Sequence, residues 1–260
     1  MATSHAPVQA VIFDYGDTLA HFGPVENALL AAYEGVREKL IAAGKKVLLN
    51  GTVSIPAAHL LLEGVSKRFW QILNRSYDED KSMEELDAAL LFRSALAALG
   101  ISVDDTLLEE IILTEEEVGY ALQERAPEAP EVAARLRARG LKLGLVSNYC
   151  SLPSVVRRHA RQSELLQLVD ESIFSCELGL RKPHPRIYQI VLERLNVAPE
   201  QAVFIGDRLR EDVMGPKALG MRAILTHQFR QEDPAQAFVP PDAVITRLAE
   251  LPTVLEGWEG

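Results

Sequence analysis

Residues 8–19 read VQAVIFDYGDTL, an apolar run that ends abruptly in acidic and glycine residues. Val8 to Phe13 is short, almost continuously apolar and rich in β-branched side chains, which is typical of a strand buried on both faces of a parallel sheet. The segment Asp14-Tyr15-Gly16-Asp17 that follows it favours a turn. The stretch therefore predicts a buried strand that ends at Asp14.

The same pattern, an apolar run followed by small or polar residues, returns three times further along the chain. Leu141 to Val146 ends at Ser147-Asn148, Ala202 to Ile205 ends at Gly206-Asp207, and Arg222 to Leu225 ends at Thr226-His227. Segments of helical periodicity separate these runs, at Glu128 to Arg139, Pro185 to Leu195 and Asp212 to Leu219. Strands that alternate with helices indicate an α/β fold with a doubly wound parallel sheet.

Residues 22–125 follow a different pattern, with apolar residues at three- and four-residue spacing and no convincing strand. Helices are predicted over Pro24 to Ala43, Pro56 to Arg75, Met83 to Leu99 and Asp104 to Glu124. We therefore predict an all-helical domain at residues 22–125. It interrupts an α/β domain formed by residues 1–21 and 126–260.

Composition and charge narrow the class of protein. A chain of 260 residues with 48% hydrophobic and 25% charged content is typical of a soluble globular protein. The net charge of −10 argues against nucleic acid as a partner, because that binding needs clustered Lys and Arg. No apolar run approaches the length of a membrane span, and Met1 to Gln9 has no basic residue of an export signal. Cys150 and Cys176 lack the spacing of a zinc or disulfide framework, which predicts a cytoplasmic location.

Polar residues that follow the predicted strands are expected to meet. In open parallel sheets, ligands bind at the carboxyl ends of the strands. A lysine joins this edge from the loop at residues 179–185, which enters a helix at a proline. A carboxylate, a hydroxyl, a lysine and an acidic pair are the groups that phosphoryl transfer through an aspartyl-phosphate requires. The candidates are Asp14, Ser147, Asn148, Lys182, Asp207 and Asp212.

Each of these residue types has a chemical role in phosphoryl transfer. A carboxylate such as Asp14 can attack phosphorus and give an acyl phosphate that water then cleaves. Two negatively charged reactants repel, and Mg²⁺ bound by carboxylates such as Asp14 and Asp207 would neutralise their approach. The Ser147 hydroxyl can hold phosphate oxygens, and Lys182 can balance charge on both the nucleophile and the phosphate.

Four motifs resemble those of the haloacid dehalogenase superfamily, and they occur in the order typical of that family. They are FDYGDTL at 13–19, LVSN at 145–148, RKP at 181–183 and GDRLREDV at 206–213. The resemblance implies a Rossmann-like core, a mobile helical cap at the insertion, and a phosphatase whose nucleophile is Asp14.

The resemblance also implies a set of ligands. A small phosphorylated metabolite would be the substrate, with its phosphate held by Ser147, Asn148 and Lys182. Mg²⁺ would be bound through Asp14, the backbone carbonyl of Gly16 and Asp207, with Asp212 supporting the site.

The chain departs from the family pattern at one position. Most phosphatases of the family carry a second aspartate two residues after the nucleophile, where it protonates the leaving group, and that position here is Gly16. Three interpretations stay open. Asp17 replaces the missing acid, or the leaving group needs little protonation, as in a sugar 1-phosphate, acyl phosphate or aryl phosphate, or the protein is a slow or vestigial enzyme.

Two other functions compete with a phosphatase. A 2-haloacid dehalogenase would use the same aspartate on carbon without magnesium, which leaves Asp207 and Asp212 unexplained. A non-catalytic binding or regulatory protein would explain Gly16, but it would have no need to retain Asp14, Ser147, Lys182 and Asp207 together. The sequence leaves a monomer and a homodimer as alternatives.

Overall fold

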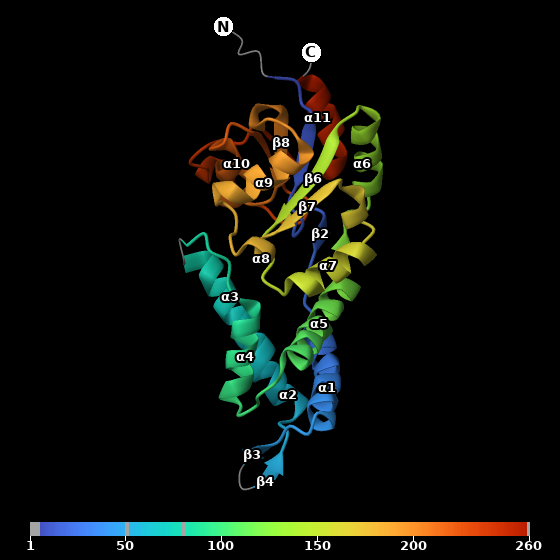
Figure 1. Ribbon diagram of the computed structural model, residues 1–260. Coiled ribbons are helices and arrows are strands. Elements are labelled where there is room, and N and C mark those ends of the chain that lie inside the picture. Colours follow the sequence, from blue (N-terminus) through green and yellow to red (C-terminus); the bar gives the residue numbers. More distant parts are fainter. Residues whose placement is uncertain (1–5, 50–51, 80–81, 259–260) are drawn as a thin grey trace. The chain divides into compact units, whose positions relative to one another are not determined.

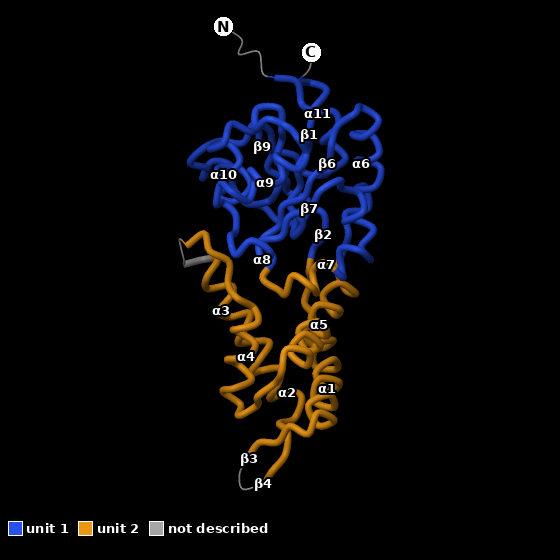
Figure 2. The backbone as a smooth tube through the Cα atoms, viewed as in Figure 1, with its two compact units in different colours: residues 1–21, 124–149, 158–260 blue, residues 22–123, 150–157 orange. Residues whose placement is uncertain are grey.

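The computed structural model describes residues 6–49, 52–79 and 82–258. The chain forms two compact units (Figure 2): unit 1 comprises residues 1–21, 124–149 and 158–260, and unit 2 comprises residues 22–123 and 150–157. The sequence did not indicate that residues 150–157 belong to unit 2. None of the helices in the described part of the chain combines the length and the apolar character that crossing a membrane requires.

Unit 1 is built on a six-stranded sheet in the order β10-β9-β8-β1-β6-β7, in which every neighbouring pair is parallel. This confirms the predicted doubly wound α/β fold, and β1 lies between β6 and β8. The strands are β1 (Ala10–Phe13), β6 (Lys142–Ser147), β7 (Glu171–Phe174), β8 (Ala202–Gly206), β9 (Arg222–Thr226) and β10 (Ala243–Ile245).

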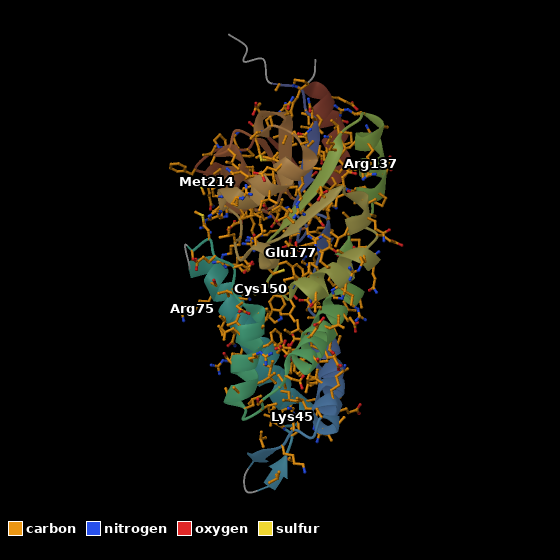
Figure 3. All side chains as sticks on the ribbon, viewed as in Figure 1. Lys45, Arg75, Arg137, Cys150, Glu177 and Met214 are labelled. Carbon is orange, nitrogen blue, oxygen red and sulfur yellow. The ribbon has the colours of Figure 1, made fainter. Side chains whose placement is uncertain are left out.

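Helices cover both faces of this sheet (Figure 1). Ile12 and Val146 belong to the core beneath α9, whereas Phe13 and Leu143 face α6, because successive side chains of a strand point to opposite faces. Arg137 of α6, labelled in Figure 3, pairs with Asp170 just before β7 at 2.7 Å. The helices of unit 1 are α6 (Ala129–Ala138), α8 (Ser175–Leu178), α9 (Pro185–Leu195), α10 (Gly215–Lys217) and α11 (Leu251–Gly257), and α7 (Pro153–Gln162) has residues in both units.

The other elements of unit 1 are short. Single turns of 3₁₀- or π-helix connect the longer elements, and a two-stranded antiparallel ribbon lies where the chain leaves unit 1 and returns to it. These elements are β2 (Ala20–His21), β5 (Glu124–Arg125), η2 (Leu166–Leu168), η3 (Pro199–Gln201), η4 (Leu209–Met214, a π-helix), η5 (Pro234–Gln236) and η6 (Leu248–Glu250).

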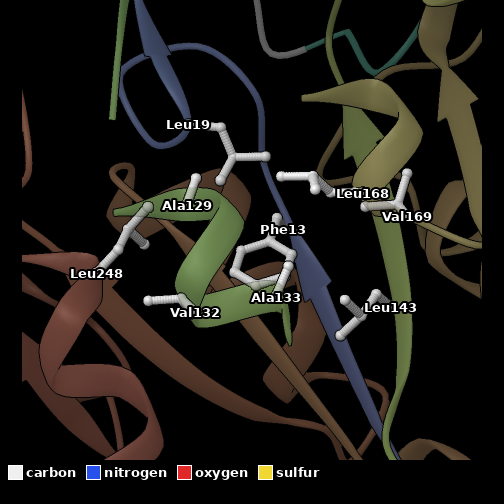
Figure 4. Close-up of a pocket in the computed structure, with 9 residues that line it drawn as sticks. All are labelled: Phe13, Leu19, Ala129, Val132, Ala133, Leu143, Leu168, Val169 and Leu248. Atoms are coloured by element: carbon white, nitrogen blue, oxygen red, sulfur yellow. The ribbon is translucent and has the colours of Figure 1, made fainter. Parts of the chain in front are cut away.

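A small cavity separates α6 from the sheet (Figure 4). Its volume is about 10 Å³, enough for at most one water, and its walls are apolar. It is a packing defect of the core and offers a ligand no polar contact. The lining residues are Phe13, Leu19, Ala129, Val132, Ala133, Leu143, Leu168, Val169 and Leu248.

Unit 2 is mainly helical. Asp87 and Asp104 cap α4 and α5, since their carboxylates accept hydrogen bonds from Leu90 N and Leu107 N. Apolar side chains from all its longer helices form one core. The helices are α1 (Glu26–Ala42), α2 (Ala58–Leu61), η1 (Leu62–Lys67, a π-helix), α3 (Arg68–Glu79), α4 (Ala88–Ala98) and α5 (Asp105–Leu122).

The expectation that residues 22–125 contain no strand is wrong at two places, since β5 (Glu124–Arg125) pairs with β2 at the end of this range. β3 (Val47–Leu49) and β4 (Thr52–Ser54) pair as an antiparallel ribbon. Both runs favour strands because they contain Val or Thr. The intervening sequence Asn50-Gly51 is a pair common in two-residue hairpins; these two residues lie outside the described ones.

A buried carboxyl group lies inside unit 2 without a cationic partner among the described residues. Glu115 on α5 accepts hydrogen bonds from the hydroxyls of Tyr33 on α1 and Ser66 on η1. Burial raises the pKa of Glu115 to about 7, and the two hydrogen bonds only partly oppose that shift. The free energy of unfolding therefore depends on the charge of this group.

The variant Glu115→Gln is expected to reduce the pH dependence of stability. The pKa of Glu115 is higher in the folded chain than in the unfolded one, so its contribution to stability is present below about pH 4.5 and is lost as the pH rises through about 7. That loss is about 3 kcal/mol, and glutamine, which does not ionise, should avoid it. Urea unfolding at pH 5 and pH 8 measures the effect. The exposed neighbour variant Glu109→Gln is the control, and equal pH dependence in Glu115→Gln and wild type would contradict the expectation.

Candidate active site

Three adjacent strands end at one edge of the sheet in unit 1. Asp14 follows β1, Ser147 is the last residue of β6, and Asp207 follows β8. Because β6, β1 and β8 are neighbours and parallel, their carboxyl ends lie side by side. Asp14 N donates a hydrogen bond to Ile205 O at 2.8 Å, which extends the β1–β8 pairing to the aspartate itself.

Lys182 reaches this edge from the loop between α8 and α9. Its Nζ lies 2.7 Å from Asp14 Oδ1 and 2.7 Å from Asp212 Oδ1, and 5.2 Å from the centre of the Phe204 ring. The lysine side chain is 3% exposed. Burial alone would lower the pKa of Lys182, but the two carboxylates outweigh burial and raise that pKa above its ordinary value. A permanently charged lysine therefore joins two buried carboxylates.

Asn148 positions the Lys182 backbone. Its Oδ1 accepts a hydrogen bond from Lys182 N at 2.7 Å, and its Nδ2 donates one to Lys182 O at 3.2 Å. Both polar atoms of the Asn148 side chain are thus engaged with the lysine backbone. The hydroxyl-bearing Ser147 beside it is 3% exposed.

Asp212 is held by the turn that follows β8. Its Oδ2 accepts a hydrogen bond from Arg208 N at 3.0 Å, so the carboxylate closes its own turn and also contacts Lys182. A Cβ atom added to Gly206 would lie 2.3 Å from Asp212 Cγ. Glycine is therefore required at position 206 for Asp212 to reach the site.

Among the described residues, Asp207 differs from Asp14 and Asp212 in forming no hydrogen bond with Lys182. Its Oδ2 is buried and forms no hydrogen bond with the described residues, and the nearest cationic atom paired with it is Arg230 Nε at 3.7 Å. Carboxylate oxygens of Asp14, Asp207 and Asp212 lie within 4.8 Å of one another. Buried carboxylate oxygens, one of which accepts no hydrogen bond from the described residues, fit a hard divalent cation such as Mg²⁺.

The charges of the site also favour a bound cation. Burial raises the pKa of Asp14 to about 6 against the opposing effect of Lys182. Burial, together with repulsion from Asp212 and Asp14, raises the pKa of Asp207 to about 9. Three buried carboxylates share one buried lysine and the partly exposed Arg230, so they outnumber the positive charges, and a bound cation would favour the ionised forms of Asp14 and Asp207.

The turn after β1 differs from an extended strand. Asp17 has φ of +54°, in the left-handed region, and its Oδ1 lies 2.6 Å from His21 Nδ1. A Cβ added to Gly16 would meet no atom within 4 Å beyond its chain neighbours. The contact with His21 was missed from the sequence, where the only signal is a histidine four residues after an aspartate.

The structure brings together Asp14, Lys182, Asp207 and Asp212 through direct contacts or short separations. Arg230 is a second residue that sequence reasoning missed. It lies in the loop after β9, far beyond Asp207 in the chain. No motif marks that loop, so only the fold shows the proximity.

The sequence and the fold of this chain are similar to those of known proteins. Residues 8–220 match the family model of haloacid dehalogenase-like hydrolases. The chain is 27% identical to a glyceraldehyde 3-phosphate phosphatase of Methanopyrus kandleri, over 94% of this chain and 95% of that protein. It is 34% identical to a phosphoserine phosphatase of Thermus thermophilus, over 48% and 49% of the two chains. A crystal structure of a 2-haloacid dehalogenase from Pseudomonas syringae covers 96% of this chain and 99% of its own, with 26% identity and a TM-score of 0.63.

Proposed function

The chain belongs to the family of haloacid dehalogenase-like hydrolases, and from this membership we propose that it is a magnesium-dependent phosphatase of small phosphorylated metabolites. One observation carries the proposal: buried Lys182 contacts Asp14 and Asp212, while one oxygen of the neighbouring Asp207 carboxylate is buried without a hydrogen bond from the described residues. This arrangement supplies a nucleophile, a fixed positive charge and oxygen ligands for a cation. The relatives named as phosphatases support the same activity.

In the proposed mechanism Asp14 attacks phosphorus and forms an aspartyl-phosphate, which water then cleaves. Lys182 keeps the attacking carboxylate ionised and balances charge that gathers on the phosphoryl oxygens. Ser147 binds a phosphate oxygen, and Asn148 acts by holding the Lys182 backbone in place.

Asp14, Asp207 and the backbone carbonyl of Gly16 would hold the Mg²⁺ ion, with Asp212 in support. When bound, the cation neutralises the repulsion between the carboxylate and the phosphate. The helical insertion, proposed at residues 22–125, would act as the cap over the substrate. We place the protein in the cytoplasm, which is consistent with two free cysteines, Cys150 and Cys176.

Removal of the metal is expected to stop turnover. Phosphate release from 4-nitrophenyl phosphate should fall to the level of the Asp14→Asn variant in EDTA and return when excess Mg²⁺ is added. An Asp14-dependent rate that EDTA leaves unchanged would contradict the metal requirement. Halide release from a 2-haloacid, without phosphate release from any ester, would instead favour a dehalogenase.

A phosphate-release screen identifies the substrate class. We propose three-carbon phosphates such as glyceraldehyde 3-phosphate and phosphoserine, because the phosphatases similar to this chain are named for them. The screen compares these two with phosphoglycolate, sugar 1-phosphates, sugar 6-phosphates and nucleoside monophosphates. Release no faster than Asp14→Asn on every ester would favour a non-catalytic binding protein.

A further inference from the structure

The position where the family carries a general acid holds no side chain in this protein. Gly16 lies two residues after Asp14, and the space beside it is open, since an added Cβ would meet nothing within 4 Å beyond its chain neighbours. General acid catalysis contributes about 10²- to 10⁴-fold to such reactions. An ester with a basic leaving group therefore needs a proton donor from elsewhere.

The backbone directs Asp17 away from the path of an extended strand. Its φ of +54° lies in the left-handed region, which aspartate tolerates better than most residues. Its backbone N donates a hydrogen bond to Ala20 O at 2.7 Å, which closes the turn. Residues 17 and 21 are thereby brought to one side of that turn.

The carboxylate of Asp17 contacts one nitrogen of the His21 ring. Asp17 Oδ1 and His21 Nδ1 are 2.6 Å apart, and the ring stacks on Phe229 with centroids 5.8 Å apart and planes 19° apart. The other nitrogen, Nε2, has no hydrogen-bond partner among the described residues, and the side chain is 41% exposed. A carboxylate that fixes Nδ1–H leaves Nε2 as the atom that can exchange protons.

Contacts within unit 1 connect this ring to the acidic cluster through one loop. Phe229 stacks on His21, and the next residue, Arg230, has its Nε 3.7 Å from Asp207 Oδ2. One short loop therefore reaches both the His21 ring and the Asp207 carboxylate. On the other side, Asp17 is only three residues from Asp14.

We propose that His21 is the proton donor to the leaving group and that Asp17 is a positioning residue that orients its ring; this rests on the phosphatase function proposed above. Asp14 attacks phosphorus, the phosphorus–oxygen ester bond breaks, and the departing oxygen keeps the electron pair and takes a proton from Nε2 of the protonated ring. Water then attacks the aspartyl-phosphate and gives a proton to Nε2. The bond to Asp14 breaks, which restores the carboxylate and the protonated ring and releases inorganic phosphate.

The charged groups around the ring are Asp17 in the same turn, Glu124 opposite His21 on β5, and Arg230 beside Phe229. A glutamine side chain cannot supply this proton, so the variant His21→Gln should remove the donor while these three charged groups stay in place.

Two aryl esters of nearly equal size test the proposal in the full chain with Mg²⁺ present. Phenol is a weaker acid than 4-nitrophenol, so phenyl phosphate needs a proton donor far more than 4-nitrophenyl phosphate does. His21→Gln should lower kcat/KM about 10²-fold on phenyl phosphate and less than about threefold on 4-nitrophenyl phosphate. Asp17→Asn should also lower the ratio of kcat/KM on phenyl phosphate to kcat/KM on 4-nitrophenyl phosphate, by about tenfold. The ratio is taken on one sample, so any misfolded fraction cancels.

Two further variants complete the design. His59→Gln removes an exposed histidine of α2 in unit 2 and should leave both rates unchanged. Gly16→Asp, added to His21→Gln, should restore at least tenfold of the loss on phenyl phosphate, because open space lies beside Gly16.

The outcomes are distinct. An equal fall on both esters, or a large effect of Asp17→Asn with none of His21→Gln, would overturn the role of His21. The second result would assign the proton to Asp17 itself. If the wild type hydrolyses neither ester with Mg²⁺, the proposed phosphatase function fails as well, whereas an active wild type with an unchanged ratio overturns only the role of His21.

Discussion

The variant Asp14→Asn is expected to lose turnover on the order of 10⁵-fold or more, as removal of a nucleophile does in other hydrolases. Asparagine has nearly the same volume as aspartate, so the β1–β8 pairing at Asp14 N should persist. The amide lacks the negative charge that attacks phosphorus, so no aspartyl-phosphate should form. Rapid acid quenching of the enzyme with a labelled phosphate ester measures both the rate and the trapped intermediate.

Asp104→Asn is the matched control for this measurement. Asp104 caps α5 in unit 2 by accepting a hydrogen bond from Leu107 N, and asparagine caps helices about as well as aspartate. Its turnover should equal that of the wild type. A trapped phosphoenzyme in Asp14→Asn would show that another side chain is the nucleophile.

The variant Lys182→Met is expected to lose both activity and about 3–5 kcal/mol of unfolding free energy, the cost of breaking a buried ion pair. Methionine fills a similar volume but leaves Asp14 and Asp212 buried without their shared cation. Without the lysine charge, burial and repulsion from Asp212 would raise the pKa of Asp14 further in the folded chain. A raised folded pKa favours the folded state at low pH, so the loss should be larger at pH 8 than at pH 5.

Urea unfolding in EDTA at the two pH values measures this effect. Lys217→Met is the control, because Lys217 also contacts an aspartate, Asp242, at 2.6 Å but near the surface. A pair of that kind contributes about 0–1 kcal/mol. Similar losses of unfolding free energy in the two variants would show that burial does not increase the contribution of the Lys182 ion pairs to stability.

The strands at the centre of the sheet could be predicted because burial on both faces makes them continuous apolar runs. β1, β6, β8 and β9 all have this character. Of the edge strands, β7 is as short as β1 but begins with Glu171 and Ser172, and β10 has only three residues, so their sequences resemble loops. Their positions follow from pairing with a neighbour, which local sequence does not encode.

The helix predicted at Asp212 to Leu219 is divided in the structure. It starts earlier, as the π-helix η4 at Leu209–Met214, and continues as α10 at Gly215–Lys217. Pro216 lacks a backbone N–H and interrupts regular helical hydrogen bonding. Periodicity alone does not distinguish these helical forms.

The predicted family is confirmed by the match over residues 8–220. The placement of Asp14 and Asp207 at one sheet edge followed from the strand pattern, since parallel strands bring their ends together. The contact of Lys182 with Asp212 could not be predicted from the strand pattern, because it depends on two loops and on the absence of a side chain at Gly206. The individual roles of the site residues stay predictions for the experiments above.

The sheet order has a consequence for how activity appears during folding. Lys182 and Asp14 touch although 168 positions separate them in the chain, and β1 pairs with β6 and β8 although residues 22–123 of unit 2 come between them in the sequence. Contacts between residues so far apart in the chain form late in folding, because closing a long loop costs conformational entropy before the contact stabilises the chain. A refolding chain should therefore regain helical signal well before it regains any turnover, so catalytic recovery reports completion of the central sheet.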